Sequence, residues 1–141
     1  MCGYYIMSTL EKKISISAGS ALMFGVLNLP AVYEMTNRVL PVATMRNGCP
    51  TSVGLLVHTF VFLGLTYLTM CGAKMSDGMK LSNTIFSALI FYFLSSKAMY
   101  SMVGKVIGSN YSNSSGCHTM SGAVVHALVY CAALVGVMYL E

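Results

Sequence analysis

A small set of polar and ionisable residues, set within or beside long apolar stretches, carries the chemistry that this sequence could perform. Its members are Asn28, Glu34, His58, Lys97, His118 and His126. A neutral imidazole can bind a metal ion or pass a proton, so His58 and His126 with one carboxylate are candidates for either role. The alternative is a layer of hydrogen bonds and snorkelling side chains that keeps helices in register. Because catalytic metal sites usually have three protein ligands and only one acid is at hand, we expect no catalytic residue, metal or cofactor.

The cysteines and two sequons are the other candidate sites. The five cysteines form no CxxC pair and no other metal-ligand spacing. Cys49 and Cys117 can pair in an oxidising compartment, while two free thiols in a reducing one fit the sequence equally well. Asn110 and Asn113 each begin an N-glycosylation sequon, and the alternative is a polar loop that is rich in Ser and Asn by chance.

The composition determines the solvent in which these residues lie. Charged residues make up 9% of the 141 residues and apolar residues 56%, whereas a soluble domain has about 25% charged residues. So few charges cannot keep so much apolar surface in water, which nearly excludes a soluble enzyme. The eight Lys and Arg residues are scattered along the chain, so we expect no nucleic-acid partner.

Four stretches are long enough to cross a bilayer, whose hydrocarbon core of about 30 Å needs roughly 20 apolar residues in a helix. The expected spans are 14–33, 51–73, 81–104 and 120–140. Pro30 is expected to kink the first span, and the polar residues at 95–97 to break the third. No internal sequence repeat is evident. We therefore expect an all-α integral membrane bundle of four transmembrane helices with short loops, forming a single membrane domain over residues 1–141.

Four antiparallel spans place both chain ends on one side of the membrane. Counting residues along the spans then brings the polar set together near the opposite leaflet, on four different helices. The loops that contain Cys49, Cys117 and the two sequons lie on that side too. Lys12 and Lys13, directly before the first span, favour a cytosolic location for the chain ends. No A-x-A-like site follows the first span, so we expect no cleavable signal peptide.

Several short motifs in the first half of the chain carry a resemblance. They are Asn28-Leu29-Pro30-Ala31-Val32-Tyr33, Thr36-Asn37, Gly48-Cys49-Pro50-Thr51 and Gly54-Leu55-Leu56-Val57-His58-Thr59-Phe60-Val61-Phe62. In these motifs the chain resembles small multi-spanning membrane proteins of nucleocytoplasmic large DNA viruses, such as chlorella viruses and relatives of mimivirus. The likeness covers about residues 14–70. It implies a protein of the membrane inside an icosahedral capsid that links this membrane to capsid or minor capsid proteins.

Three classes of function follow from these observations. The first is a structural virion membrane protein without enzymatic activity, whose partners are the lipid bilayer, capsid or minor capsid proteins and further copies of itself. Arg38, Arg46 and the loop at 109–118 are then the contact candidates. The second is a small oligomeric ion or proton channel or transporter that uses the polar layer of His58, Lys97 and His126. The third, a membrane-embedded redox enzyme or glutathione transferase, would need a CxxC pair or several Arg residues at helix ends, which the sequence lacks.

Overall fold

The computed structural model describes residues 9–72, 76–108 and 117–140. This part of the chain forms six α-helices, a 3-10 turn and a two-stranded hairpin, so the all-α prediction is confirmed. The elements are α1 (Thr9–Leu27), α2 (Pro30–Val39), β1 (Met45–Arg46), β2 (Cys49–Pro50), α3 (Ser52–Thr69), η1 (Met70–Gly72), α4 (Asp77–Leu94), α5 (Lys97–Ile107) and α6 (Met120–Leu140).

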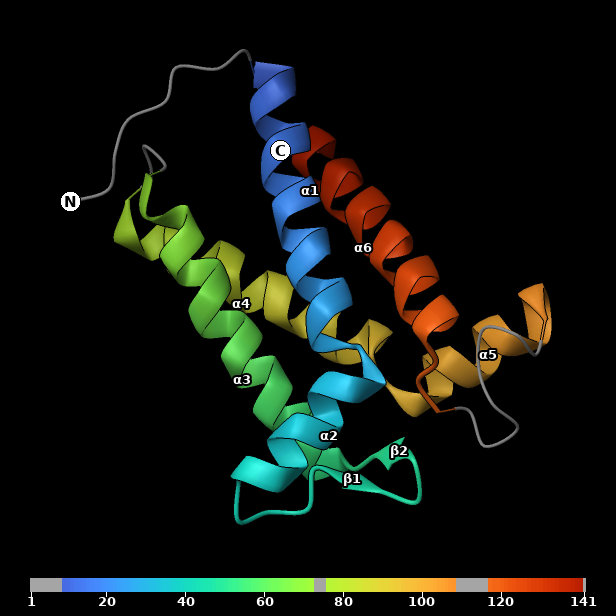
Figure 1. Cartoon of the computed structure of the whole chain (residues 1–141). Coiled ribbons are helices and arrows are strands. Elements are labelled where there is room, and N and C mark those ends of the chain that lie inside the picture. The colour runs from blue at the N-terminus through green and yellow to red at the C-terminus, as the bar shows by residue number, and fades with distance from the viewer. Residues whose placement is uncertain (1–8, 73–75, 109–116, 141) are drawn as a thin grey trace.

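Four long helices build a bundle in which α1 packs along α6 and α3 packs along α4 (Figure 1). They contain 19, 18, 18 and 21 residues in chain order, which corresponds to roughly 27–32 Å at 1.5 Å per residue. Two of them, α3 and α6, are long and apolar enough to cross a membrane by themselves, and the number rises to four if each bent pair of helices counts as one span. The described chain therefore has two to four candidate spans, as a multi-pass membrane protein requires.

Two sharp breaks interrupt the first and third expected spans. The axis turns by 62° between α1 and α2 and by 58° between α4 and α5. Pro30 begins α2 and lacks the N–H that would continue α1. Ser96 caps α5 instead, because its hydroxyl oxygen accepts from the Met99 N–H at 3.3 Å. The expected kink at Pro30 and the expected break at 95–97 are thus present, and the first helix ends at Leu27 and the third at Leu94.

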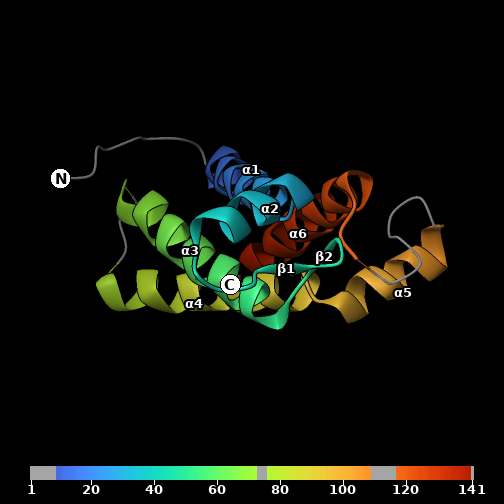
Figure 2. The ribbon, with the colours of Figure 1, turned by 60° about the horizontal axis from the view of Figure 1, so that its bottom comes forward.

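The two halves of the chain share one plan, a helix, a break, a short helix, a loop and a long helix. In the first two helices of each half, equivalent residues are 67 positions apart, as in the pairs Phe24 and Phe91, Leu27 and Leu94, and Tyr33 and Tyr100. In the third helix they are 68 positions apart, as in His58 and His126, and Phe62 and Tyr130. In both views α2 lies beside the start of α3, and α5 beside the start of α6 (Figures 1 and 2). An approximate two-fold axis therefore runs along the bundle, and the expectation of no internal repeat is wrong because the repeat conserves positions and few residue identities.

Four aromatic side chains on this axis hold the halves together. Phe24 stacks on Tyr130 with ring centres 4.7 Å apart, and Phe91 stacks on Phe62 at 4.6 Å. The crossing pairs meet edge to face, Phe24 with Phe91 at 5.2 Å and Phe62 with Tyr130 at 5.7 Å. All four are fully buried. The two kinds of contact are the favourable geometries of aromatic pairs, and each occurs twice.

Candidate functional site

A row of five aromatic rings in contact crosses the molecule at the level of the helix breaks. Tyr33 stacks on His58 with ring centres 3.8 Å apart and lies 5.3 Å from His118. Tyr100 repeats this arrangement in the second half, stacking on His126 at 3.9 Å and meeting His118 edge to face at 4.0 Å. All five side chains are buried. The row joins α3 to α6 by way of α2, the segment before α6, and α5.

His58 and His126 bind the carbonyl groups that the helix breaks release. Leu27 and Leu94 end α1 and α4, and the Nδ1 atoms of His58 and His126 lie 2.8 and 2.9 Å from their carbonyl oxygens. A carbonyl oxygen only accepts, so each Nδ1 carries the proton. Each imidazole therefore replaces a backbone partner that the break removes, in surroundings where an unpaired carbonyl is costly.

His118 does the same for the next carbonyl of the second break. Its Nε2 lies 2.9 Å from the carbonyl oxygen of Ser95 and donates to it. Burial lowers the pKa of His118 to about 4, although the hydrogen bond to Ser95 opposes this decrease. The side chain is therefore neutral at pH 7, and its Nδ1 is a hydrogen-bond acceptor without a partner among the described residues.

The two halves of the row differ at one position. The hydroxyl oxygen of Thr36 lies 2.8 Å from Nε2 of His58. The equivalent residue of the second half is Val103, and within the described chain Nε2 of His126 has no hydrogen-bond partner. The Thr36 hydroxyl also donates to the Val32 carbonyl, so Nε2 of His58 shares its neighbour, whereas Nε2 of His126 has none in the described chain.

The structure brings together only part of the polar set expected from the sequence. It places His58, His118 and His126 in the row, and it buries Asn28, whose side chain donates to the Phe24 carbonyl at 2.9 Å. Glu34 on α2 and Lys97 at the start of α5 are exposed and lie outside the row. They lie beyond the two breaks, on helices that turn away from the bundle axis. The described residues contain no group of three His, Cys, Asp or Glu that could hold a metal ion.

The two tyrosines of the row were missed at the sequence level. The signal that could have found them is a repeated spacing, in which a Phe is followed by a Leu after three residues and by a Tyr after six more. It occurs at Phe24-Leu27-Tyr33 and again at Phe91-Leu94-Tyr100.

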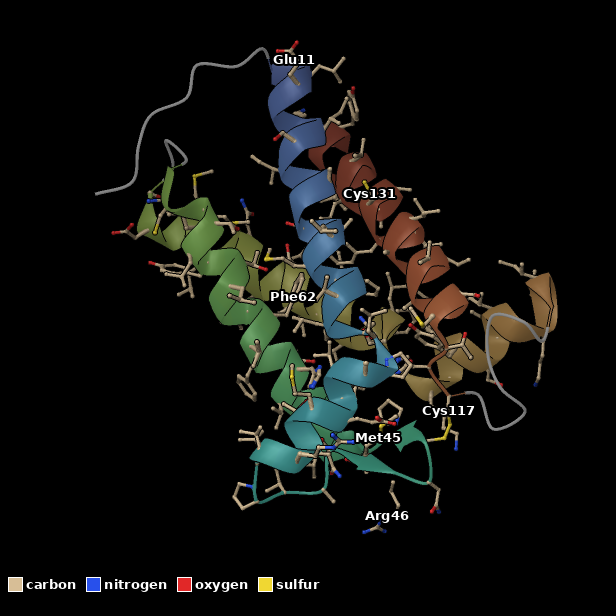
Figure 3. The ribbon with its side chains drawn as sticks, in the orientation of Figure 1. Glu11, Met45, Arg46, Phe62, Cys117 and Cys131 are labelled. Atoms are coloured by element: carbon tan, nitrogen blue, oxygen red, sulfur yellow. A yellow bond between two sulfur atoms is a disulfide. The ribbon has the colours of Figure 1, made fainter. Side chains whose placement is uncertain are left out.

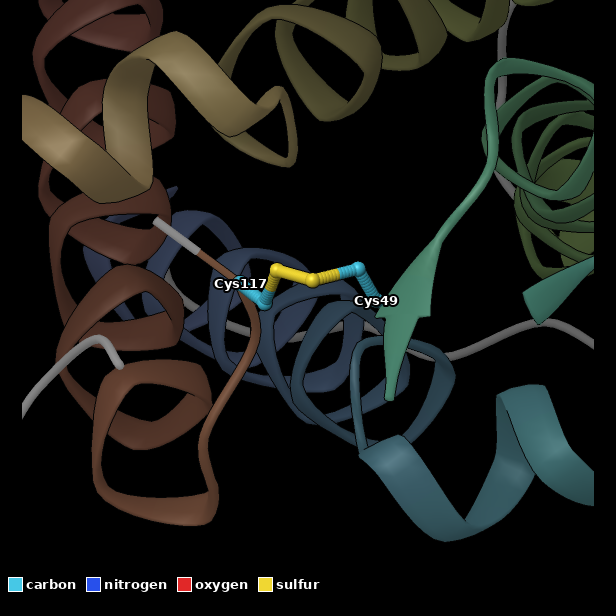
Figure 4. The surroundings of a disulfide bond; sticks show 2 residues. All are labelled: Cys49 and Cys117. Carbon is cyan, nitrogen blue, oxygen red and sulfur yellow. A yellow bond between two sulfur atoms is a disulfide. The ribbon is translucent and has the colours of Figure 1, made fainter. Parts of the chain in front are cut away.

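A disulfide between Cys49 and Cys117 closes this end of the bundle, with Cα atoms 5.1 Å apart. It joins β2 to the segment before α6 (Figure 4), and its cysteines are 68 residues apart, the same spacing as His58 and His126. Thr51 and Thr119, each two residues after one of these cysteines, are also equivalent. The hydroxyl oxygen of Thr51 accepts from the Gly54 N–H, and that of Thr119 from the Gly122 N–H, both at 3.0 Å. Cys71 and Cys131 are free and half-buried. The sequon residues Asn110 and Asn113 lie outside the described residues.

The β1–β2 hairpin forms part of the molecular surface at the end that carries the disulfide. Its turn places Asn47 and Gly48 in the left-handed region, with φ of 53° and 75°, as a tight hairpin turn requires. Arg46 beside the turn and Arg38 near the end of α2 are both exposed. Figure 3 shows Arg46 at the opposite end of the molecule from Glu11.

The chain matches no protein-family model, no curated protein and no solved structure.

Proposed function

We propose that this chain is a structural membrane protein, without enzymatic activity, of the inner membrane of a large icosahedral DNA virus, where it links the membrane to capsid or minor capsid proteins. The observation that supports it best is the use of the buried histidines. His58, His118 and His126 each bind a backbone carbonyl at a helix break. These hydrogen bonds hold the helices in place, as expected if the polar layer keeps the helices in register.

Apolar residues on the outside of the bundle support four membrane spans, formed by α1, α3, α4 and α6. One large side chain on each helix, 62 to 70% exposed, illustrates the pattern: Leu22, Phe60, Leu89 and Leu128. These are two equivalent pairs of the repeat, 67 and 68 residues apart. An apolar surface that surrounds the molecule on both halves fits lipid better than water.

The end that carries the hairpin is suited to docking against a protein shell. Several contacts fix its loop. Asn37 Oδ1 accepts from the Thr44 N–H at 3.0 Å, and Thr44 O accepts from the Thr51 N–H at 3.0 Å. The disulfide ties Cys49 to Cys117 in the segment before α6. A surface that is already ordered loses little conformational entropy when it binds. The exposed Arg38 and Arg46 give it positive charge, and many copies under a lattice would add their weak contacts.

A proton or ion channel is the alternative, and one observation favours it. Nε2 of His126 and the hydroxyl groups of Tyr33 and Tyr100 are buried without a hydrogen-bond partner in the described part of the chain. Water in an oligomer could connect them. In liposomes this alternative expects a proton flux that His126→Phe abolishes, whereas the structural function expects wild type and variant to show the same background leak.

The decisive experiment is mass spectrometry of gradient-purified particles from the source after salt and carbonate washes. The proposal expects the chain at a constant ratio to the capsid proteins. Replacing both Arg38 and Arg46 by Glu should weaken its retention when the shell is partly stripped, while Lys80→Glu, at the opposite end, should not. Absence from washed particles, with the chain left in host membranes, would reject the proposal.

A further inference from the structure

The two short helices, α2 and α5, carry the same pattern of exposed residues. Residues that match 67 positions apart on their exposed sides are Ala31 and Ala98, Met35 and Met102, Arg38 and Lys105, and Val39 and Val106. The half-buried positions match less well, since Val32 corresponds to Met99 and Thr36 to Val103. Packing inside the molecule does not explain a similarity that is greater on the outside. A contact that both helices make with their surroundings does explain it.

The exposed side of each short helix is apolar toward its end. Val39 is 76% exposed and Val106 is 79% exposed, the two highest values among the large apolar side chains of the described residues. One helical turn earlier, Met35 is 60% and Met102 is 52% exposed. Covering these four side chains would remove apolar surface from water, which is favourable in proportion to its area.

Both short helices lie at the end of the bundle where the expected membrane spans stop. The breaks turn them away from α1 and α4 by 62° and 58°. Figure 1 shows α2 and α5 pointing away from each other at the end that carries the hairpin. Exposed apolar side chains continue along α1 and α4 as far as Val26 and Phe93, directly before the breaks. If the long helices span a bilayer, a helix that turns aside at this level lies along the bilayer surface.

The charges of these helices complement an anionic lipid surface. Arg38 and Lys105 are exposed, and each directly precedes the exposed valine of its helix. Lys97 adds a third exposed cation and Glu34 is the acidic residue of the two helices, so three basic residues and one acidic residue give a net charge of +2. A cation beside an apolar side chain suits the boundary between headgroups and acyl chains, where the charge can reach phosphate groups and the apolar group can enter hydrocarbon. A second copy of the same surface would bring like charges together.

We propose that α2 and α5 are interfacial helices that lie on one leaflet and bind anionic phospholipid headgroups. Met35, Val39, Met102 and Val106 enter the boundary with the acyl chains, while Arg38 and Lys105 bind the headgroups. This proposal rests on the four membrane spans of the proposed function and not on the capsid contact.

The repeat also distinguishes Arg38 from Arg46. Arg38 has a basic counterpart in Lys105, whereas the second half has no Lys or Arg between Lys105 and Cys117, the part that corresponds to the hairpin. Arg46 therefore lies outside the shared pattern, and it remains the charge that belongs to the capsid contact alone.

The first test measures how deep the two valine positions lie. Val39→Cys and Val106→Cys, each in a full chain whose cysteines other than Cys49 and Cys117 are replaced by Ser, carry an environment-sensitive fluorophore in vesicles of phosphatidylcholine and phosphatidylglycerol. Spin-labelled phospholipids quench the fluorophore from a nitroxide placed either near the headgroup or near the end of the acyl chain. We expect the shallow label to quench both positions more strongly. Phe60→Cys, at the middle of α3, is the control that the deep label should quench more strongly.

The proposal requires the shallow position for both helices. It is overturned if either valine position is quenched by neither label or is quenched more by the deep one. Absence of quenching together with crosslinking between copies through Val106→Cys would show that a second copy covers the helix instead of lipid.

The second test measures the lipid preference of the full chain by native mass spectrometry after reconstitution in nanodiscs of the same two lipids. Arg38→Gln and Lys105→Gln should each lower the retention of phosphatidylglycerol relative to phosphatidylcholine about fivefold, the effect of one cation near an anionic surface. Arg46→Gln is the matched control, because it removes the same charge at the same end of the molecule but from the hairpin. Equal losses in Arg46→Gln and Lys105→Gln would overturn the proposal, since the attraction would then belong to the whole end.

Neither test contains capsid proteins, so its failure and the failure of the proposed function are distinguishable. Absence of the chain from washed particles would reject the capsid link and leave the lipid contacts of α2 and α5 in place. Deep or unquenched valine positions would reject the interfacial helices and leave the capsid link in place.

Discussion

At the residue scale, the most informative side chains are the three imidazoles that bind backbone carbonyls. A helix that breaks inside a protein leaves carbonyl groups without partners, and a bilayer offers no water to replace them. His58, His118 and His126 supply donors where the breaks need them. The same ring type therefore performs one task three times, which explains why histidines lie in the interior of so apolar a chain.

Replacing His58 by Ala should destabilise the protein by about 1–3 kcal/mol, because the Leu27 carbonyl is left unpaired in apolar surroundings. His126→Ala should act in the same direction through the Leu94 carbonyl. The measurement is equilibrium unfolding in mixed micelles of neutral detergent and dodecyl sulfate. Phe60→Ala, on the exposed face of α3, is the control with little expected change. Unchanged stability in both histidine variants would contradict the capping role.

His118 should make stability depend on pH. Burial lowers its folded-state pKa to about 4, while an unfolded chain has a pKa of about 6.5. Between these values the unfolded state binds more protons, so stability is complete above pH 6.5 and is lost as the pH falls toward 4. The full effect is roughly 3 kcal/mol at about 1.4 kcal/mol per pKa unit. Unfolding free energies at pH 7.5, 5.5 and 4.5 should decrease less in His118→Gln, and parallel decreases would contradict this assignment.

At the element scale, the breaks and the loops decide the architecture. Each break turns a short helix out of the bundle, and in the first half the following loop returns the chain to the start of α3. Close packing accompanies this return. A Cβ on Gly54 would collide with the carbonyl oxygen of Thr44, whereas one on Gly64 would meet nothing within 4 Å.

Gly54→Ala should therefore destabilise the protein by about 1–3 kcal/mol, because the loop must move away from α3. Gly64→Ala, in the same helix, should be neutral or stabilising by up to about 1 kcal/mol, since Ala is the better helix former. Thermal unfolding of the two variants beside the wild type measures the contrast. Equal effects at the two positions would show that the loop does not lie against α3.

The disulfide should stabilise the bundle through the long loop that it closes. Its cysteines are 68 residues apart, and a loop of that length corresponds to a stabilisation of about 4 kcal/mol in the chain-entropy account. Cys49→Ser and Cys117→Ser should each lower the melting temperature and remove its sensitivity to reductant. Cys71→Ser and Cys131→Ser, which replace free thiols, are the controls. A wild-type melting temperature that reductant does not change would argue against the bond.

At the scale of the whole molecule, the repeat and the apolar exterior predict how the chain lies in a membrane. The bundle axis and the approximate two-fold axis coincide, so both halves cross in the same sense. Glu11 and Arg46 lie at opposite ends of the molecule (Figure 3). Four spans therefore place these two residues on opposite sides of the bilayer.

This topology can be tested with Glu11→Cys and Arg46→Cys, each in a chain whose Cys2, Cys71 and Cys131 are replaced by Ser. A membrane-impermeant maleimide added to sealed vesicles should label one variant before permeabilisation and the other only after it. Phe60→Cys, on the exposed apolar side of α3, should stay unlabelled before and after permeabilisation if that side faces lipid. Labelling of the first two variants from the same side would exclude four spans.

The sequence by itself predicted the candidate membrane spans, the helical fold and the places where helices break. Long apolar runs, Pro30 and the polar residues at 95–97 act through local physics, because a bilayer requires each backbone group to be satisfied within its own helix. The grouping of histidines near one end also followed from counting residues along the spans. Exposure of Glu34 and Lys97 did not follow, because the angle of each break is set by packing against other helices.

Only the tertiary structure decided which atom each imidazole meets, which tyrosines separate the imidazoles, and that the two halves are equivalent. In the sequence, His58 and Leu27 are 31 residues apart, and His126 and Leu94 are 32 residues apart. Pairings at such distances depend on how four helices pack, and no local propensity encodes them. The repeat is a similarity of contacts, so it becomes visible when the two halves lie against each other and the same rings meet twice.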